Sequence, residues 1–276
     1  MPNELSVILA VWDDYVDFLP DALASLKMQD TSYELIIVDN ASRVPIVVNE
    51  NCTLIRLDSR VTLGAARNIG TANARCSLVC YMDADDMLVP KILNFLMTQL
   101  SSAADLDSIA MRMLAWDAQA NEFYESRFPP KIANLFARVP RILAIANAFR
   151  HQYPMAAASI HRREAIVAAG GFSTNKYPDD WALANALMAR GRVKLVPLPG
   201  RVYRIHSRSL DDAPRSVARE GFYLVRKRLM SDPKTSLTIQ VLMPLIRVAH
   251  ALQVRRYPRI SPNWSGQESN HSHRSD

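Results

Sequence analysis

The chain has 276 residues, of which 49% are hydrophobic and 22% are charged. This balance is typical of a globular protein and excludes an intrinsically disordered chain. No run of 18 apolar residues is present, so we expect no membrane-spanning helix, and the N-terminus shows no signal-peptide pattern. Three cysteines, Cys52, Cys76 and Cys80, are too few for a disulfide framework. We expect buried free thiols rather than a metal site, in a reducing, cytoplasmic compartment.

The net charge of +6 is carried by the C-terminal part of the chain. Residues 214–276 contain 11 Lys and Arg against 4 Asp and Glu, whereas residues 1–213 contain 22 against 23. A basic tail can meet anionic lipid or nucleic acid, or it can be the solvated surface of a helix. Because interleaved aromatic residues and a known nucleic-acid module are missing, we expect no nucleic-acid binding.

Short apolar runs of strand length alternate with helical patterns in the first third of the chain. The expected strands cover 5–11, 34–39, 53–57 and 77–82, and the expected helices cover 18–28, 64–73 and 90–100. This alternation predicts an α/β fold with a mostly parallel sheet flanked by helices.

The rest of the chain gives weaker patterns. We expect strands at 108–114, 193–196 and 201–205, and helices at 129–150, 166–172 and 180–190, the second of them ending at Gly170-Gly171. Residues 214–256 read as helical, with breaks at Pro233 and Pro244. The expected division is therefore a domain over 1–213 with halves of about 1–100 and 101–213, a basic helical extension over 214–260, and a flexible tail over 261–276.

Acidic residues follow several of the expected strands. Ligands of parallel sheets bind beyond the carboxyl ends of the strands, and Trp12, Asp13, Asp39 and the segment 83–86 belong to that rim. Carboxylates gathered there repel one another unless a cation or hydrogen-bond donors are present. Asp83-Ala84-Asp85 could aim two carboxylates at Mg²⁺ or Mn²⁺, or it could be a solvated acidic turn.

Five motifs follow one another along the chain. They are Val38-Asp39-Asn40-Ala41-Ser42, Gly64-Ala65-Ala66-Arg67-Asn68-Ile69-Gly70, Tyr81-Met82-Asp83-Ala84-Asp85-Asp86, Gly170-Gly171-Phe172 with Asp179-Asp180-Trp181, and Tyr203-Arg204-Ile205-His206. Their order resembles glycosyltransferase family 2, whose nucleotide-sugar domain has the GT-A fold. The resemblance covers roughly residues 5–210, and its two departures are Ala10-Val11-Trp12-Asp13, where the family has Pro-x-Tyr-Asn, and Asp179-Asp180, where Glu-Asp is more common.

The resemblance implies roles for these residues. The donor-binding residues would be Ala10, Val11, Trp12, Asp13, Asp39, Arg67, Asp83, Ala84 and Arg204. Asp85, His206 and Asp83 would bind Mn²⁺ or Mg²⁺, and Asp180 would be the general base, with Trp181 and Tyr177 as an apolar wall beside it. The alternatives are a helix cap for Asp39, a surface salt bridge for Arg67, simple packing for Arg204, a structural role for His206, and a cap of the next helix for Asp179 or Asp180.

The function that the resemblance implies is an inverting, metal-dependent transfer of a sugar. The donor would be a nucleoside diphosphate sugar, with a leaning to UDP, and the acceptor a hydroxyl of a saccharide or lipid-linked glycan in surface polysaccharide or glycolipid assembly. Residues 215–256 could lie on the inner face of a bacterial membrane, or pack on the catalytic domain or a second subunit. The rival functions are a non-catalytic nucleotide-binding module and a sugar-nucleotide nucleotidyltransferase. A dehydrogenase is disfavoured because Gly-x-Gly-x-x-Gly is missing after the first strand.

Overall fold

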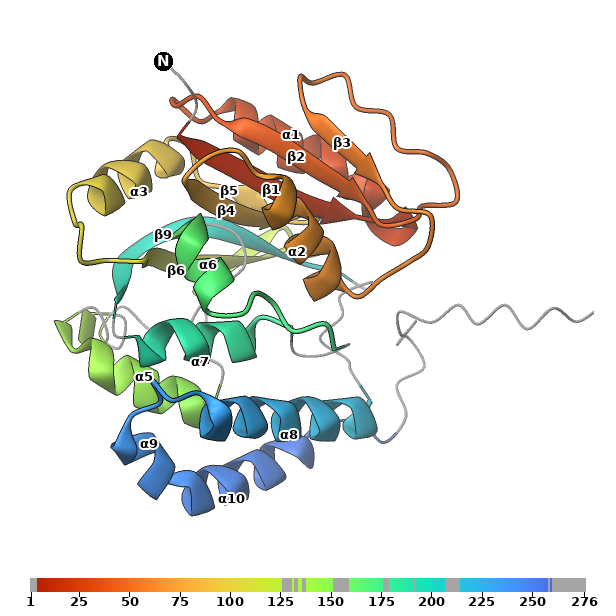
Figure 1. Cartoon of the computed structure of the whole chain (residues 1–276). Coiled ribbons are helices and arrows are strands. Elements are labelled where there is room, and N and C mark those ends of the chain that lie inside the picture. The colour runs from red at the N-terminus through yellow and green to blue at the C-terminus, as the bar shows by residue number, and fades with distance from the viewer. Residues whose placement is uncertain are drawn as a thin grey trace, which may run out of the picture.

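The computed structural model describes residues 4–125, 131, 134–135, 138–150, 159–175, 179–190, 192–206, 214–257 and 259. Nine strands in this part of the chain form one mixed sheet, which occupies the upper half of the molecule in Figure 1. The strands are β1 Leu5–Val11, β2 Glu34–Asp39, β3 Thr53–Arg56, β4 Leu78–Asp83, β5 Met87–Leu88, β6 Ser108–Asp117, β7 Glu122–Glu125, β8 Ser159–Arg162 and β9 Val193–Ile205.

The strand order is β3-β2-β1-β4-β8-β6-β9-β5, with β7 paired to β6. The strands β1 to β4 run parallel to one another, and β6 runs parallel to β9. The strand β8 is antiparallel to both β4 and β6, so it joins the two parallel parts. This mixed, mostly parallel sheet confirms the expected α/β class.

Helices cover both faces of the sheet. They are α1 Leu19–Lys27, which follows a 3₁₀ segment at Asp13–Phe18, then α2 Leu63–Asn73, α3 Ile92–Ser101, α5 Pro140–Phe149, α6 Arg163–Ala168 and α7 Trp181–Ala189. Side chains of β1 alternate between the two faces, as strand geometry requires. Val7 and Leu9 belong to the cluster with α1 and α3, whereas Ile8 and Ala10 belong to the cluster with α2, α6 and α7.

The predicted elements of the first third are confirmed to within a few residues, and the later ones less well. The helix expected over 90–100 begins at Ile92. In place of the single helix expected over 129–150, the described helix α5 covers residues 140–149. The two strands expected at 193–196 and 201–205 are one strand, β9, which continues through register shifts opposite β6. The short strands β5, β7 and β8 were not predicted.

The C-terminal helices α8 Arg215–Ser231, α9 Leu237–Val241 and α10 Met243–Val254 form the lowest layer in Figure 1. Phe222 and Val225 of α8 and Ile246 of α10 pack in one buried cluster with Trp181 of α7 and Ala148 of α5. The extension therefore shares a core with the preceding helices, as one of the alternatives expected. Pro244 stands in the first turn of α10, where its missing N–H leaves no helical hydrogen bond unmade.

None of the described helices is long and apolar enough to cross a membrane. The three cysteines are free thiols, of which Cys76 and Cys80 are buried as expected and Cys52 is partly buried. The flexible tail expected over 261–276 lies outside the described residues.

Candidate active site

The acidic rim forms at the carboxyl ends of β1, β2 and β4. In the parallel register Val11 pairs with Asp39, and Ala10 pairs with Asp83. The rim is not a solvated turn, because Asp86 is fully buried and Asp85 is only 9% exposed. Its carboxylates therefore need partners inside the protein.

Arg67 of α2 supplies one of these partners. Its guanidinium, 3% exposed, forms ion pairs with Asp83 at the end of β4 and with Asp179, at 2.7 Å, just before α7. Burial opposes the charge, but the carboxylates of Asp83, Asp179 and Asp180 raise the pKa of Arg67 above its usual value. The salt bridge considered for Arg67 is thus real but buried, and it links the two expected halves of the domain.

The glycine motifs explain how Asp179 comes so close to α2. A Cβ at Gly64 would collide with the carbonyl oxygen of Ser173 and would lie 3.0 Å from the Asp179 Cβ. Asn68, one turn further along α2, donates to the carbonyl of Phe172 at 3.0 Å and accepts from its N–H at 2.9 Å. Gly171 has a φ of +65°, a conformation that favours glycine. These contacts dock the segment before α7 onto α2.

A second buried arginine, Arg201 of β9, lies on the other side of Asp83. Its Nη2 is 2.7 Å from Asp83 Oδ2, and it also forms an ion pair with Asp86. Burial raises the pKa of Asp83, but Arg67 and Arg201 outweigh it and lower that pKa below its ordinary value. Burial, together with the charges of Asp85 and Asp83, raises the pKa of Asp86 well above its ordinary value despite Arg201.

Asp85 and His206 form the pair best suited to a cation. Asp85 Oδ2 lies 3.0 Å from His206 Nε2, and both side chains are little exposed. The imidazole packs against Phe18, with ring centroids 4.5 Å apart, and against Tyr15 at 5.9 Å. Among the described residues, no group of three His, Cys, Asp or Glu could hold a metal ion.

This donor set fits Mg²⁺ or Mn²⁺ with a restriction. Such ions often take only one or two protein ligands and complete their shell with substrate phosphates and water. Asp85 and His206 can provide two. Asp83 has each carboxylate oxygen on a guanidinium, so it would have to give up an arginine before it could bind the ion. Its place among the metal ligands stays a prediction.

The acidic residues expected to bind the donor at the ends of β1 and β2 form hydrogen bonds and ion pairs with other residues of this chain. Asp39 does not cap a helix: it accepts from the N–H of Ser42 at 2.9 Å and forms an ion pair with Arg56 at 2.7 Å. Asp13 accepts from the backbone and side chain of Arg43. Both acids thereby order the loop between β2 and β3. The neighbouring side chains of Ala10, Val11 and Ala84 are buried.

Trp12 does not offer a free aromatic surface in this structure. The ring is 4% exposed, and the Arg60 guanidinium lies over it at 5.0 Å from the centroid. Tyr15 packs edge-on against it at 4.7 Å. A nucleobase could stack on Trp12 only if Arg60 moved.

Arg204 packs rather than facing a ligand. Its Nε donates to the carbonyl oxygen of Asp85 at 3.0 Å and its Nη2 to Asp21 at 2.6 Å. Its guanidinium also lies over the rings of Phe18 and Trp116, at 5.0 and 4.8 Å. The alternative of a packing role therefore describes the structure better than a phosphate contact, and this side chain fixes the position of the Asp85 backbone.

Asp179 and Asp180 play different parts at the start of α7. Asp180 occupies the N-cap position, but its side chain makes no capping hydrogen bond, and Asp179 is committed to Arg67. The side chain of Asp180 therefore does not cap this helix. Burial, with the charges of Asp180 and Asp83 and against that of Arg67, raises the pKa of Asp179 to about 6.

The wall expected beside the base is described only in part. Trp181 is buried and donates from Nε1 to the carbonyl of Asn147 at 2.6 Å, so it packs toward the C-terminal helices. Tyr177 lies outside the described residues.

The sequence reasoning missed Arg201 and gave Asp86 no role. The only signal for Arg201 was its place two residues before the Tyr203 motif.

The comparisons with known proteins agree with this architecture. The family model described as glycosyl transferase family 2 matches residues 6–119. No match was found among curated protein sequences. Among solved structures, S. aureus TarS 1–349 in complex with UDP-GlcNAc superimposes with a TM-score of 0.68 at 15% identity, covering 90% of this chain and 72% of that one.

Two further TarS structures superimpose similarly. TarS 1–349 in complex with UDP gives a TM-score of 0.61 at 16% identity, with 83% and 66% of the two chains covered. The structure described as S. aureus TarS gives 0.65 at 14% identity, with 90% of this chain but only 43% of that one covered. At such identities the likeness shows a shared fold. Residues 6–119 thus match the model of glycosyl transferase family 2, within a chain that has the fold of these TarS structures.

Proposed function

We propose that the chain transfers a sugar from a nucleoside diphosphate donor to a hydroxyl acceptor, with inversion at the anomeric carbon. The observation that carries the proposal is the convergence of Asp83, Asp85, Asp179 and His206 from distant parts of the chain onto the carboxyl edge of a family 2 sheet. The UDP and UDP-GlcNAc complexes of TarS support UDP as the nucleotide.

The proposed roles follow the geometry. Asp39 and the ends of β1 and β2 would hold the nucleoside, with Arg56 exchanged for hydrogen bonds from the base or ribose. Asp85 and His206 would hold Mg²⁺ or Mn²⁺, which when bound supplies positive charge to the leaving diphosphate. Asp83 would orient the donor while it is held by Arg67 and Arg201.

Asp180 would take the proton from the acceptor hydroxyl. Its neighbour Asp179 pairs with Arg67, and the charge of Asp180 also acts on this guanidinium, so Asp180 lies close to the buried charges of the site. The acceptor oxygen forms the new glycosidic bond as the bond to the diphosphate breaks on the opposite face. A saccharide or lipid-linked acceptor, and membrane contact through residues 215–256, belong to the same proposal.

Turnover of a donor panel tests the proposal. UDP-, GDP-, dTDP- and ADP-sugars with Mn²⁺ are incubated with the chain, and the released nucleoside diphosphate is quantified with and without candidate acceptors. We expect one donor to be consumed, and Asp180→Asn to lower the rate by about 10²- to 10⁴-fold. Asn175→Ala is the control, because Asn175 is a nearby polar residue that contacts only Ser173 among the described residues.

An unchanged rate in Asp180→Asn would contradict the assignment of the base. Nucleotide binding without consumption of any donor would favour the non-catalytic module. Formation of a nucleotide sugar from a nucleoside triphosphate and a sugar phosphate would instead favour the nucleotidyltransferase.

A further inference from the structure

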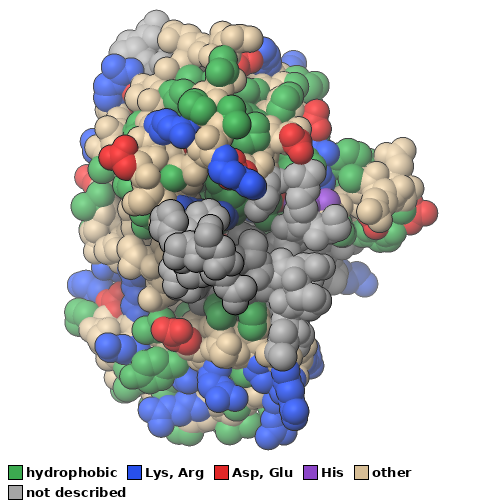
Figure 2. Space-filling model, turned by 90° about the vertical axis from the view of Figure 1, so that its right-hand side faces the viewer, with side chains coloured by type: hydrophobic (Ala, Val, Ile, Leu, Met, Phe, Trp, Pro, Cys, Tyr) green, Lys and Arg blue, Asp and Glu red, His purple; other side chains and the backbone are tan. Residues whose placement is uncertain are grey.

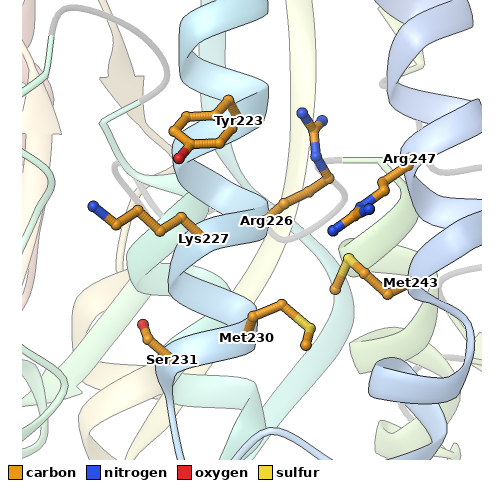
Figure 3. Close-up of a pocket in the computed structure, with 7 residues that line it drawn as sticks. All are labelled: Tyr223, Arg226, Lys227, Met230, Ser231, Met243 and Arg247. Atoms are coloured by element: carbon orange, nitrogen blue, oxygen red, sulfur yellow. The ribbon is translucent and has the colours of Figure 1, made fainter.

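The helices α8 and α10 enclose a cationic groove with a volume of about 570 Å³. It is lined by Tyr223, Arg226, Lys227, Met230, Ser231, Met243 and Arg247, and the side chains of Arg226 and Arg247 lie next to each other across it (Figure 3). No Asp or Glu lines the groove. The two guanidinium groups therefore lie between α8 and α10 beside Met230 and Met243, whereas Lys227 extends toward the other side of α8 (Figure 3).

The charge in this groove is not neutralised by the described part of the chain. The contact of Arg226 is with His250 Nδ1, at 3.1 Å, and His250 binds the carbonyl of Ala148 through Nε2 at 2.9 Å. Burial, with the charge of Arg226, lowers the pKa of His250 to about 4, so the imidazole is neutral. No ion pair of Arg226, Lys227 or Arg247 is found among the described residues. An anion in the groove would relieve their mutual repulsion.

Exposed aliphatic side chains form a stripe on α9 and α10, and α10 also contributes Met243 and Arg247 to the groove. The stripe consists of Leu237, Val241, Leu245, Val248 and Leu252, each between 55% and 74% exposed. In α10 the members of the stripe point away from Met243, Ile246, His250 and Val254, which are buried against the rest of the protein. The spacing of three and four residues keeps Leu245, Val248 and Leu252 on one side of α10, and Leu237 and Val241 are four residues apart in α9. This side of α9 and α10 has no covering element among the described residues.

The surroundings of the stripe are basic. Lys234, Arg247, Arg255 and Arg256 belong to the same layer and are exposed. Figure 2 shows Lys and Arg together with apolar side chains at the lower end of the molecule, the end formed by α8 and α10 in Figure 1. An apolar stripe flanked by cations matches an interfacial helix on an anionic bilayer, where the apolar side enters the lipid and the cations meet headgroups.

We infer that α8–α10 dock this protein on an anionic phospholipid bilayer, with a lipid phosphate beside Arg226 and Arg247 in the groove and the aliphatic stripe in the interface. The inference deepens the membrane contact of the proposed function by naming the surface and the headgroup chemistry. A second copy of the chain would cover the stripe but would leave Arg226 and Arg247 without an anion, which is why a bilayer is the better partner.

Sedimentation of the full chain with vesicles tests the docking. Vesicles of phosphatidylglycerol and phosphatidylcholine are compared with vesicles of phosphatidylcholine alone. We expect binding to the anionic vesicles, weakened about 30-fold in Arg226→Gln/Arg247→Gln if each cation contributes as interfacial cations usually do. Leu245→Ser/Leu252→Ser tests the stripe and is expected to weaken binding about tenfold or more.

Matched controls separate docking from general charge attraction and from loss of folding. Lys27→Gln/Lys91→Gln removes two exposed cations from the other end of the molecule, and Val47→Ser/Val167→Ser removes two exposed aliphatic side chains elsewhere. These controls are expected to bind as the wild type does. Melting temperatures within about 2 °C of the wild type show that the groove and stripe variants, whose sites are on the surface, remain folded.

Two outcomes would overturn the inference: no binding of the wild type to anionic vesicles, or equal loss of binding in the groove variant and the Lys27/Lys91 control. If vesicle binding is absent, a wild-type dimer that the stripe variant converts to a monomer would identify a second copy of the chain as the partner of the stripe. The same samples receive nucleoside diphosphate with Mn²⁺ in a thermal-shift assay. A nucleotide shift without vesicle binding refutes only the docking, whereas vesicle binding without a nucleotide shift counts only against the proposed function.

Discussion

Arg67 and its carboxylate partners set the electrostatics of the candidate site. Asp83 lies at the end of β4 and Asp179 lies just before α7, far apart in the chain, yet both form ion pairs with the buried guanidinium of Arg67. A buried ion pair contributes little net stability, but the loss of one partner leaves an uncompensated charge and is costly. The free energy of unfolding should therefore change as the Asp179 carboxyl gains or loses its proton.

The pKa of Asp179 predicts how the effect of Asp179→Asn depends on pH. Burial raises this pKa from 3.8 to about 6 in the folded protein, so between these values the folded chain binds more protons than the unfolded chain. Ionisation of Asp179 then lowers stability as the pH rises through this window. The melting temperature of Asp179→Asn, relative to the wild type, should rise by about 3 °C or more between pH 4.5 and pH 7.

Differential scanning fluorimetry at the two pH values measures this change. Asp105→Asn is a suitable control, because Asp105 is an exposed acid whose carboxylate has no ion pair among the described residues. A constant difference between Asp179→Asn and the wild type at both pH values would contradict the raised pKa.

The site residues that could be predicted from the sequence are those that lie in short local motifs. Asp83, Asp85, Arg67 and Asp179 lie in short patterns that follow a strand or open a helix, and they were named. Arg201 was not, although it binds Asp83, because the two are 118 residues apart and the strand around Arg201 contains no pattern that marks a buried cation. The pairing of Asp39 with Arg56 was also invisible, since it depends on the register of β2 and β3.

At the scale of elements, α2 holds the two halves of the site together by close approach. Gly64 allows the backbone of Ser173 to reach the helix, and Asn68 fastens Phe172 to it. The sequence predicted this helix but could not show that its first turn contacts a segment more than a hundred residues later. The bridging strand β8 and the continuous β9 were missed for the same reason, because their pairing partners are distant in the chain.

Gly64→Ala should therefore disturb the site through the fold. The new methyl group would force the carbonyl of Ser173 outward, and we expect a loss of about 1–3 kcal/mol in the free energy of unfolding, together with weaker nucleotide binding. Urea denaturation and a nucleotide titration measure the two effects. Asn73→Ala, an exposed position at the other end of α2, should change stability by less than about 0.5 kcal/mol. Equal stability of the two variants would contradict the close approach.

At the scale of the whole molecule, the C-terminal helices are part of the core rather than an appendage. Phe222 contacts Trp181 edge-on, with ring centroids 5.0 Å apart, and His250 lies 5.1 Å from the Trp181 ring. The sequence offered a packed helix or a membrane-bound one as alternatives. The structure shows that α8 to α10 have a packed side and an exposed aliphatic side, and periodicity alone could not tell which partner each side meets.

This shared core predicts that the chain unfolds in one transition. Phe222→Ala should lower the free energy of unfolding by about 3–5 kcal/mol, because it opens a cavity under Trp181. Near-UV circular dichroism, which reports on tryptophan packing, and far-UV circular dichroism should shift together during urea denaturation. Tyr223→Ala, an exposed neighbour in α8, is the control. Two separate transitions, with only the earlier one affected by Phe222→Ala, would contradict a common core.

Nucleotide binding is the most direct test of whether the acidic rim holds a nucleoside diphosphate together with a metal ion. A thermal-shift panel of UDP, GDP, dTDP, CDP and ADP, with and without Mn²⁺, is recorded on the wild type, Asp85→Ala and the control Asp105→Ala. Binding to the folded state raises the melting temperature by mass action. We expect a Mn²⁺-dependent shift with one nucleotide, lost in Asp85→Ala and kept in the control. No shift with any nucleotide in a folded sample, or a shift that Asp85→Ala leaves unchanged, would contradict this expectation.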